Sequence, residues 1–200
     1  MRRIAFLGDS GVGKTAFLDA ALSDAAPPPP PPEPTYGVEP RTHRDAASGA
    51  AVQLWDVAGA PDRSTLETAT TRNAAAIVLL YTDERSFEAL KRRWLPRACR
   101  ASRRQGRAPP LLIVLGLGVA APDATAFGRA IDAAACLRAG RLGARQTLAR
   151  IVALVAASTE PLPLVADDAR LDDQTCERPC RYWHRCVGRA RTLDRPPRTH

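Results

Sequence analysis

Residues 8–15 read GDSGVGKT, which matches the pattern G-x-x-x-x-G-K-[ST] without a mismatch. An apolar run at residues 4–7 precedes this loop, and a helix-compatible stretch at residues 16–22 follows it. A glycine-rich loop between a strand and a helix turns its backbone N–H groups toward an anion, and the helix N-terminus adds partial positive charge. The pattern therefore restricts the start of the chain to a strand, a tight phosphate-binding loop and a helix.

Each residue type in this loop has a physical role. The glycines let the backbone curl closely around an anion. Lys14 is expected to reach the outer phosphates as a point charge, and Thr15 to offer its hydroxyl to Mg²⁺. The residues expected to contact phosphate in this loop are Ser10, Gly11, Val12, Gly13, Lys14 and Thr15.

Apolar runs of strand length recur along the chain, separated in several places by helix-compatible stretches. They lie at residues 3–7, 51–57, 75–81, 111–118 and 151–157. Such alternation predicts an α/β fold, with a mostly parallel sheet flanked by helices on both faces. Helices are expected at residues 14–23, 84–104 and 122–150, the last with breaks near Gly140 and Gly143. Pro96 is expected to kink or split the second of these helices because it has no backbone N–H.

The composition of the chain indicates the compartment and the kinds of partner to expect. The net charge is +8, and only Lys14 and Lys91 are lysine, so arginine supplies nearly all of the positive charge. Richness in arginine, alanine and proline together is typical of GC-rich coding, so we expect no specific nucleic-acid partner. Five cysteines and no secretory leader pattern favour a reduced, intracellular and cytoplasmic protein. The longest apolar run, at residues 111–121, is too short to span a bilayer.

Two further motifs restrict the class of phosphate-containing ligand that the loop is expected to bind. Asp56 closes the second apolar run and is expected to hold Mg²⁺ through a water, while Gly59 is placed to donate its N–H to a terminal phosphate. Thr35, in the loop before that run, is expected to reach the metal when a third phosphate is present. The expected magnesium ligands are therefore Thr15, Thr35 and Asp56.

With these motifs in order, the chain resembles a Ras-superfamily small GTPase, closest to the Rab branch. The resemblance rests on residues 8–15, 34–39 and 55–59 and continues through residues 72–81, Ser86-Phe87 and Trp94, so that it covers residues 3–118 in all. It implies a P-loop NTPase domain over residues 1–159 that binds GTP or GDP with Mg²⁺. It also implies protein effectors that bind the two switch regions, at residues 36–38 and 63–66.

The sequence departs from this family where hydrolysis and base reading are concerned. Ala60 stands where the family has a water-orienting glutamine, so we assign no catalytic residue and expect slow or absent GTP hydrolysis. No N-K-x-D sequence follows residues 111–116, and Asp123 comes too late to replace its aspartate. The last base-contacting loop is matched at best by residues 156–159, with Ser158 as the candidate.

These departures leave alternatives to a slow GTPase. One is a pseudo-GTPase, an interaction scaffold that has lost base-specific nucleotide binding. Another is a phosphate-loop protein with relaxed base preference that accepts ATP, because a site without the polar partner of the base loses selectivity.

Two segments lie outside the family pattern. The proline-rich insertion at residues 27–34, in the first switch loop, is interpreted as a stiff loop in preference to a docking segment for an SH3- or WW-type partner. Residues 160–200 are expected to form a partly disordered tail without a C-terminal cysteine, and hence without a prenyl membrane anchor. Ordinary cysteines are favoured there over a Zn²⁺ site, whose candidate ligands are Cys176, Cys180, His184 and Cys186.

Overall fold

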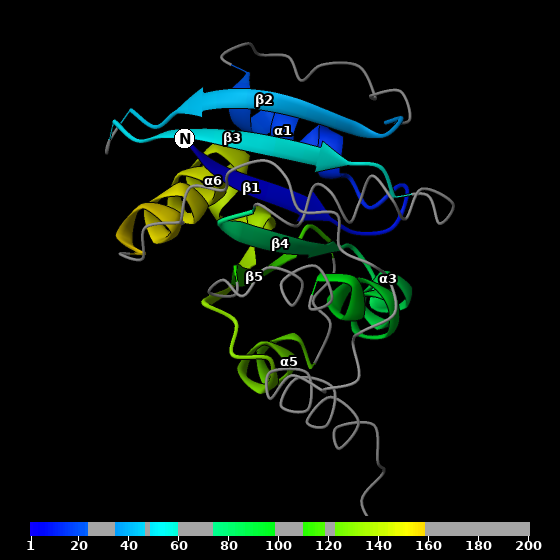
Figure 1. Ribbon diagram of the computed structural model, residues 1–200. Coiled ribbons are helices and arrows are strands. Elements are labelled where there is room, and N and C mark those ends of the chain that lie inside the picture. Colours follow the sequence, from blue (N-terminus) through cyan, green and yellow to red (C-terminus); the bar gives the residue numbers. More distant parts are fainter. Residues whose placement is uncertain (24–34, 47–48, 60–73, 99–109, 119–122, 159–200) are drawn as a thin grey trace, which may run out of the picture.

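The computed structural model describes residues 1–23, 35–46, 49–59, 74–98, 110–118 and 123–158. Within these ranges, a six-stranded sheet has the order β2-β3-β1-β4-β5-β6. The strands are β1 Arg2–Leu7, β2 Val38–Arg44, β3 Ala51–Val57, β4 Ala76–Tyr81, β5 Leu111–Gly116 and β6 Ala135–Arg138. Strand β2 is antiparallel to β3, and every other neighbouring pair is parallel (Figure 1). The predicted mostly parallel sheet is confirmed.

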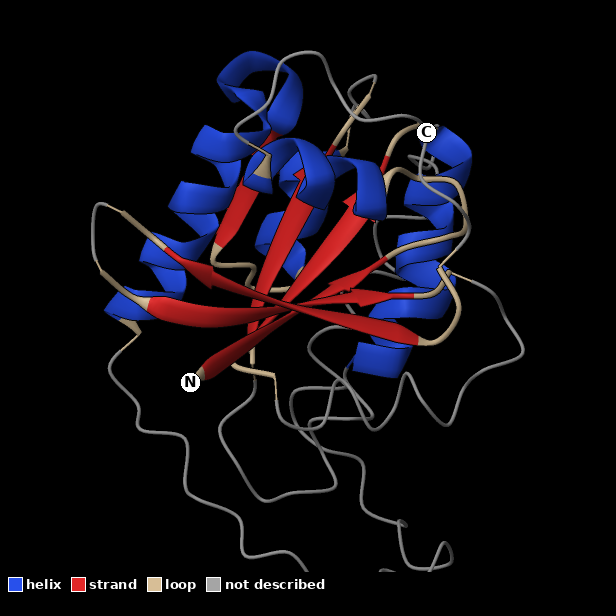
Figure 2. Cartoon of the chain, turned by 90° about the horizontal axis from the view of Figure 1, so that it is seen from above, coloured by secondary structure: helices blue, strands red, loops and turns tan. Residues whose placement is uncertain are grey.

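Helices cover both faces of this sheet, also as predicted (Figure 2). They are α1 Lys14–Leu22, α3 Glu84–Ala89, the π-helix η1 Leu90–Trp94, α5 Ala124–Ala130 and α6 Ala139–Ala157. None of the helices in the described ranges is long and apolar enough to cross a membrane.

Two buried apolar clusters explain this layering. Ile4 and Phe6 of β1 pack with α1 and α6, whereas Ala5 and Leu7 pack with α3, η1 and α5. Alternate residues of a strand point to opposite faces, so both faces of β1 are apolar. All six residues of β4 are buried, as is typical of a central parallel strand with helices on both sides.

The prediction of a strand at residues 151–157 is wrong, because this segment is the second half of α6. Leu148, Ile151, Val152 and Val155 are fully or almost fully buried, and their spacing places them on one helical face against the sheet. A short apolar run fits a buried strand and a buried helix equally well. The predicted break near Gly143 is confirmed, since this residue has a left-handed φ of 69° inside α6.

The helix expected over residues 122–150 is divided by a short edge strand, β6, and the other edge strand, β2, was not predicted. Strand β2 reads VEPRTHR and has few apolar residues, so no hydrophobic pattern marks it. Pro40 is compatible with an edge strand because one side of such a strand needs no N–H donors.

Regular α-helical geometry is interrupted near Pro96, as predicted. The N–H of Leu95 donates to the carbonyl of Leu90, five residues back, which is the π-helical pattern of η1. Upstream, Asp83 caps α3 by accepting a hydrogen bond of 2.8 Å from the N–H of Ser86. The helix is thus fixed at its start and widened one turn before the proline.

We expect Ile151→Ala to lower the free energy of unfolding by about 2–5 kcal/mol, the usual result of a cavity beneath a buried aliphatic side chain. Arg150→Ala on the same helix is the matched control, because the Arg150 side chain is exposed. Its effect is expected to stay within about 0.5 kcal/mol. Urea denaturation of both variants measures this, and equal losses would contradict the packing of α6 on the sheet.

Candidate functional site

The glycine-rich loop lies at the carboxyl end of β1 and leads directly into α1. Gly11 and Gly13 have left-handed φ values of 79° and 86°, a conformation that side chains other than glycine rarely adopt. Gly8 approaches β4 so closely that a Cβ there would lie 2.7 Å from the carbonyl oxygen of Leu80. The glycines are therefore required by the path of the loop.

The charged side chain of the loop is held over its own backbone. Lys14 is 6 % exposed, and its Nζ donates hydrogen bonds to the carbonyl oxygens of Gly8 (2.9 Å) and Asp9 (2.8 Å). Ser10 and Gly11 are exposed at the rim of the loop, whereas the side chain of Val12 is buried in the core. Val12 can therefore offer a ligand only its backbone.

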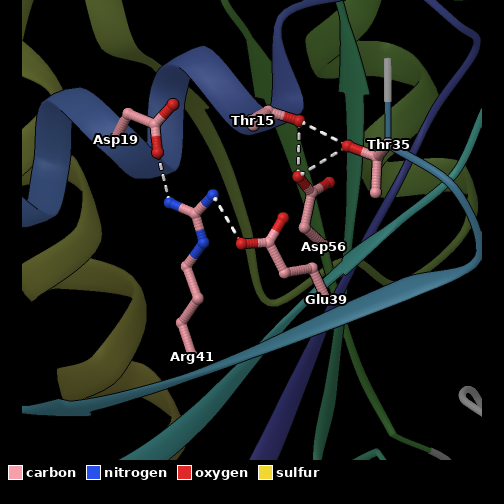
Figure 3. Close-up of polar contacts among 6 residues, drawn as sticks. All are labelled: Thr15, Asp19, Thr35, Glu39, Arg41 and Asp56. Atoms are coloured by element: carbon pink, nitrogen blue, oxygen red, sulfur yellow. Dashed lines mark hydrogen bonds and ion pairs between the residues drawn. The ribbon is translucent and has the colours of Figure 1, made fainter. Parts of the chain in front are cut away.

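The three side chains predicted to hold Mg²⁺ converge at the start of α1 (Figure 3). Thr15 Oγ1 donates to Asp56 Oδ2 at 2.5 Å and lies 2.9 Å from Thr35 Oγ1. Thr35 Oγ1 also lies 3.3 Å from the same carboxylate oxygen. These residues come from α1, β3 and the loop before β2, so the tertiary structure brings distant parts of the sequence to one point.

This donor set fits a magnesium ion. Hydroxyl and carboxylate oxygens are the ligands that a hard divalent cation prefers. Asp56 is fully buried, and its second oxygen, Oδ1, has no hydrogen-bond partner among the residues that the structure describes. Over the same residues, no three His, Cys, Asp or Glu side chains form a metal-binding group, so an ion here would rely on Asp56 and the two threonines.

Burial raises the pKa of Asp56 above its ordinary value, because a charged carboxylate is poorly solvated in the interior. The hydrogen bond from Thr15 and the positive charge of Lys14 act in the opposite direction without cancelling this effect. A bound divalent cation would offset the loss of hydration, so the carboxylate is poised to accept one.

Arg41 of β2 was not singled out from the sequence, although it lies beside this cluster (Figure 3). Its Nη1 forms an ion pair with Asp19 of α1, and its Nη2 lies 3.4 Å from Glu39 Oε1. Glu39 and Arg41 are two residues apart on one strand and hence share a face. The ion pair between Arg41 and Asp19 joins the edge strand β2 to α1 next to Asp56. A prediction of this contact from the sequence would have required the assignment of β2 as a strand.

Gly59 follows β3 and lies directly against the phosphate loop. A Cβ at this position would lie 2.2 Å from the backbone nitrogen of Ser10, so no other residue fits without a shift. Arg93 of η1 reaches the same place, where its Nη2 donates to the Gly59 carbonyl at 3.3 Å and its Nη1 to Asp9 Oδ1 at 3.2 Å. The sequence motifs gave no indication of this arginine.

The described residues that follow β5 are Leu117 and Gly118, where the family pattern predicts side chains that read the base. Leu117 faces the phosphate loop, since a Cβ on Gly13 would lie 3.4 Å from Leu117 Cδ1. Arg138, at the end of β6, donates to the Gly118 carbonyl at 3.2 Å. Asp123 is exposed and is the N-cap residue of α5.

The assignment of Ser158 to a base-contacting loop is wrong. Ser158 follows the C-terminal end of α6, and its Oγ accepts a hydrogen bond of 3.2 Å from Arg2 at the start of β1. The phosphate loop lies at the other end of β1. This error and the false strand at residues 151–157 have one cause, because residues 151–158 form the end of α6 and its C-cap.

Some predicted features fall outside the described residues. They are Ala60, the proline-rich segment and the tail with its zinc candidates, Cys176, Cys180, His184 and Cys186. They remain predictions from the sequence.

Comparisons with known proteins agree with the motifs. A family model described as "Ras of Complex, Roc, domain of DAPkinase" matches residues 3–116, more than half of the chain. The chain is 38 % identical over 97 residues to the mouse Ras-related protein Rab-37, covering 46 % of this chain and 43 % of the relative. It is 37 % identical over 93 residues to the Ras-related protein SEC4 of Saccharomyces cerevisiae, covering 44 % and 42 % respectively. The match thus spans less than half the length of each relative.

We expect Asp56→Asn to stabilise the protein at neutral pH when metal and nucleotide are absent. With a raised pKa, the folded state binds a proton more tightly than the unfolded state does. Stability of the wild type relative to Asp56→Asn should therefore fall as pH rises from below about 4, the ordinary carboxyl pKa, through the raised value. Urea denaturation in EDTA across this window measures the difference, and a difference that is constant with pH would contradict it.

Proposed function

Because this chain belongs to the Roc family of Ras-like small GTPase domains, we propose that it binds guanine nucleotide with Mg²⁺ and hydrolyses GTP slowly or not at all. The observation that supports this most directly is the convergence of Thr15, Thr35 and Asp56, with hydroxyl and carboxylate oxygens 2.5–3.3 Å apart, beside the buried Lys14. Small GTPases of this family typically bind GTP or GDP with Mg²⁺.

In the proposed complex the loop from Ser10 to Thr15 surrounds the phosphates with backbone N–H groups. Lys14 exchanges its contacts with the Gly8 and Asp9 carbonyls for contacts with the outer phosphates, or shares them. Thr15, Thr35 and Asp56 are the residues that would hold magnesium, and the ion would supply charge that neutralises the phosphates. Thr35 and Gly59 then report the presence of a third phosphate.

We base the proposal of impaired hydrolysis on Ala60, which stands where the family has a glutamine. The attacking water in related enzymes is oriented by an amide side chain that can donate and accept hydrogen bonds at once. A methyl group can do neither. Any remaining turnover would come from charge stabilisation by Lys14, the magnesium ion and the loop amides.

A second candidate, the scaffold that has lost base-specific binding, is favoured by the loop after β5. Leu117 offers no hydrogen bond to a base, and the residues that follow it are Gly118, Val119 and Ala120. A site lacking a polar partner for the base discriminates weakly between guanine and adenine. Protein effectors would bind the first switch in either case, and Tyr36 there is 77 % exposed.

We expect guanine nucleotides with Mg²⁺ to raise the melting temperature of protein stripped of bound ligand, because a ligand that binds only the folded state stabilises it. At a nucleotide concentration 100 times the Kd, the stabilisation is about 2.7 kcal/mol. Lys14→Ala should abolish the shift. Differential scanning measurements with GTP, GDP, ATP and no ligand test this.

The same panel separates the alternatives. Equal shifts with ATP and GTP would support relaxed base preference. No shift with any nucleotide would leave only the scaffold.

We expect Ala60→Gln to raise single-turnover GTP hydrolysis by about 10-fold or more, because general positioning of a nucleophile contributes factors of this size or larger. Release of inorganic phosphate from preloaded protein measures the rate, and Ala60→Leu, which adds bulk without an amide, is the control. An unchanged rate in the glutamine variant would contradict the account of the missing water contact.

A further inference from the structure

Two consecutive residues of η1 donate hydrogen bonds to one carboxylate of the phosphate loop. Trp94 Nε1 lies 2.7 Å from Asp9 Oδ1, and Arg93 Nη1 lies 3.2 Å from the same oxygen. Trp94 is fully buried in the cluster beneath α3, and the Arg93 guanidinium lies 4.7 Å from the centroid of its ring. Asp9 is thus connected to the core by the tryptophan, and the arginine is held between the ring and the carboxylate.

The π-helical turn makes this double contact sterically accessible. In an α-helix with 3.6 residues per turn, neighbouring side chains point about 100° apart. A π-helix has more residues per turn, so the angle between neighbours is smaller. Residues Leu90–Trp94 form that wider turn, which lets Arg93 and Trp94 approach the same oxygen.

Arg93 also extends beyond the phosphate loop. Its second terminal nitrogen donates to the Gly59 carbonyl at 3.3 Å, so one planar guanidinium bridges Asp9 and Gly59. The bridged backbones are already in close contact, because a Cβ on Gly59 would meet the Asp9 carbonyl carbon at 2.4 Å. The arrangement suits the fork of an arginine, which presents separate donors at fixed positions.

We propose that Arg93 is a positioning residue that holds the Gly59 peptide against the phosphate loop and thereby sets the preference for nucleoside triphosphate over diphosphate. This inference rests on the proposed nucleotide binding, in which the Gly59 N–H faces the terminal phosphate. Diphosphate lacks the group that Gly59 would contact. Loss of the guanidinium should therefore weaken triphosphate binding selectively.

The test is calorimetric titration of stripped protein with GTPγS and with GDP, at fixed Mg²⁺, for wild type, Arg93→Ala and Arg92→Ala. Arg92 is the matched control because it neighbours Arg93 on the same turn, its side chain is 79 % exposed, and its ion pair with Glu88 is long, at 3.8 Å. We expect Arg93→Ala to weaken GTPγS binding about 3- to 10-fold, a discounted value for charged hydrogen bonds that are partly exposed. GDP binding should change less than about 2-fold.

Two further variants separate positioning from a general loss of structure. Arg93→Lys keeps the charge but has one ammonium in place of the fork, so it should restore only part of the GTPγS affinity. In an Asp9→Asn background, Arg93→Ala should have a smaller effect than in the wild type, because the two residues act through one contact.

The outcomes are distinct. Equal weakening of GTPγS and GDP by Arg93→Ala would show that the arginine only stabilises the loop, and would overturn the inference. So would an effect no larger than that of Arg92→Ala. If wild-type protein binds neither nucleotide, the proposed function fails first, and this inference fails with it.

Discussion

The site is organised around a buried carboxylate, Asp56, at the carboxyl end of β3. Burial deprives it of water and raises its pKa, while hydroxyl groups from α1 and from the loop before β2 converge on only one of its oxygens. A group in this state favours a cation that can replace the lost hydration. The parallel pairing of β1 with β3 places this carboxylate beside the phosphate loop, because strands that run in the same direction end at the same edge of the sheet.

Close backbone approach is the second constraint on the site. Gly8 contacts β4 and Gly59 contacts Ser10 at distances that exclude a side chain. These contacts bring the segment after β3 onto the phosphate loop without an intervening side chain. From the π-helical turn η1, Arg93 and Trp94 both donate hydrogen bonds to the Asp9 carboxylate. Elements from both faces of the sheet therefore meet at the same loop, in direct contact with Gly59.

Much of this could be predicted because each motif carries its own local geometry. Glycines at Gly11 and Gly13 indicate left-handed backbone, and a run such as β4 indicates a central strand. The failures concern segments with weak local signals. Strand β2 is polar because it lies at an edge, so hydrophobic patterning could not mark it. Residues 151–157 are apolar enough for either secondary structure, and the choice of helix depends on which face of the sheet remained uncovered. The wrong position for Ser158 has the same origin as the false strand at residues 151–157.

The sequence by itself determined the glycine-rich loop after β1, the positions of strands β1, β3, β4 and β5, and the residues predicted to hold magnesium. These are properties of residue type and spacing along a short segment. The tertiary structure alone decided the contacts between Arg41 and Asp19 and between Arg93, Asp9 and Gly59. Those pairs are separated by tens of residues, and nothing local fixes which of the many arginines faces which carboxylate. Only the packing of helices on the two faces of a twisted sheet selects them.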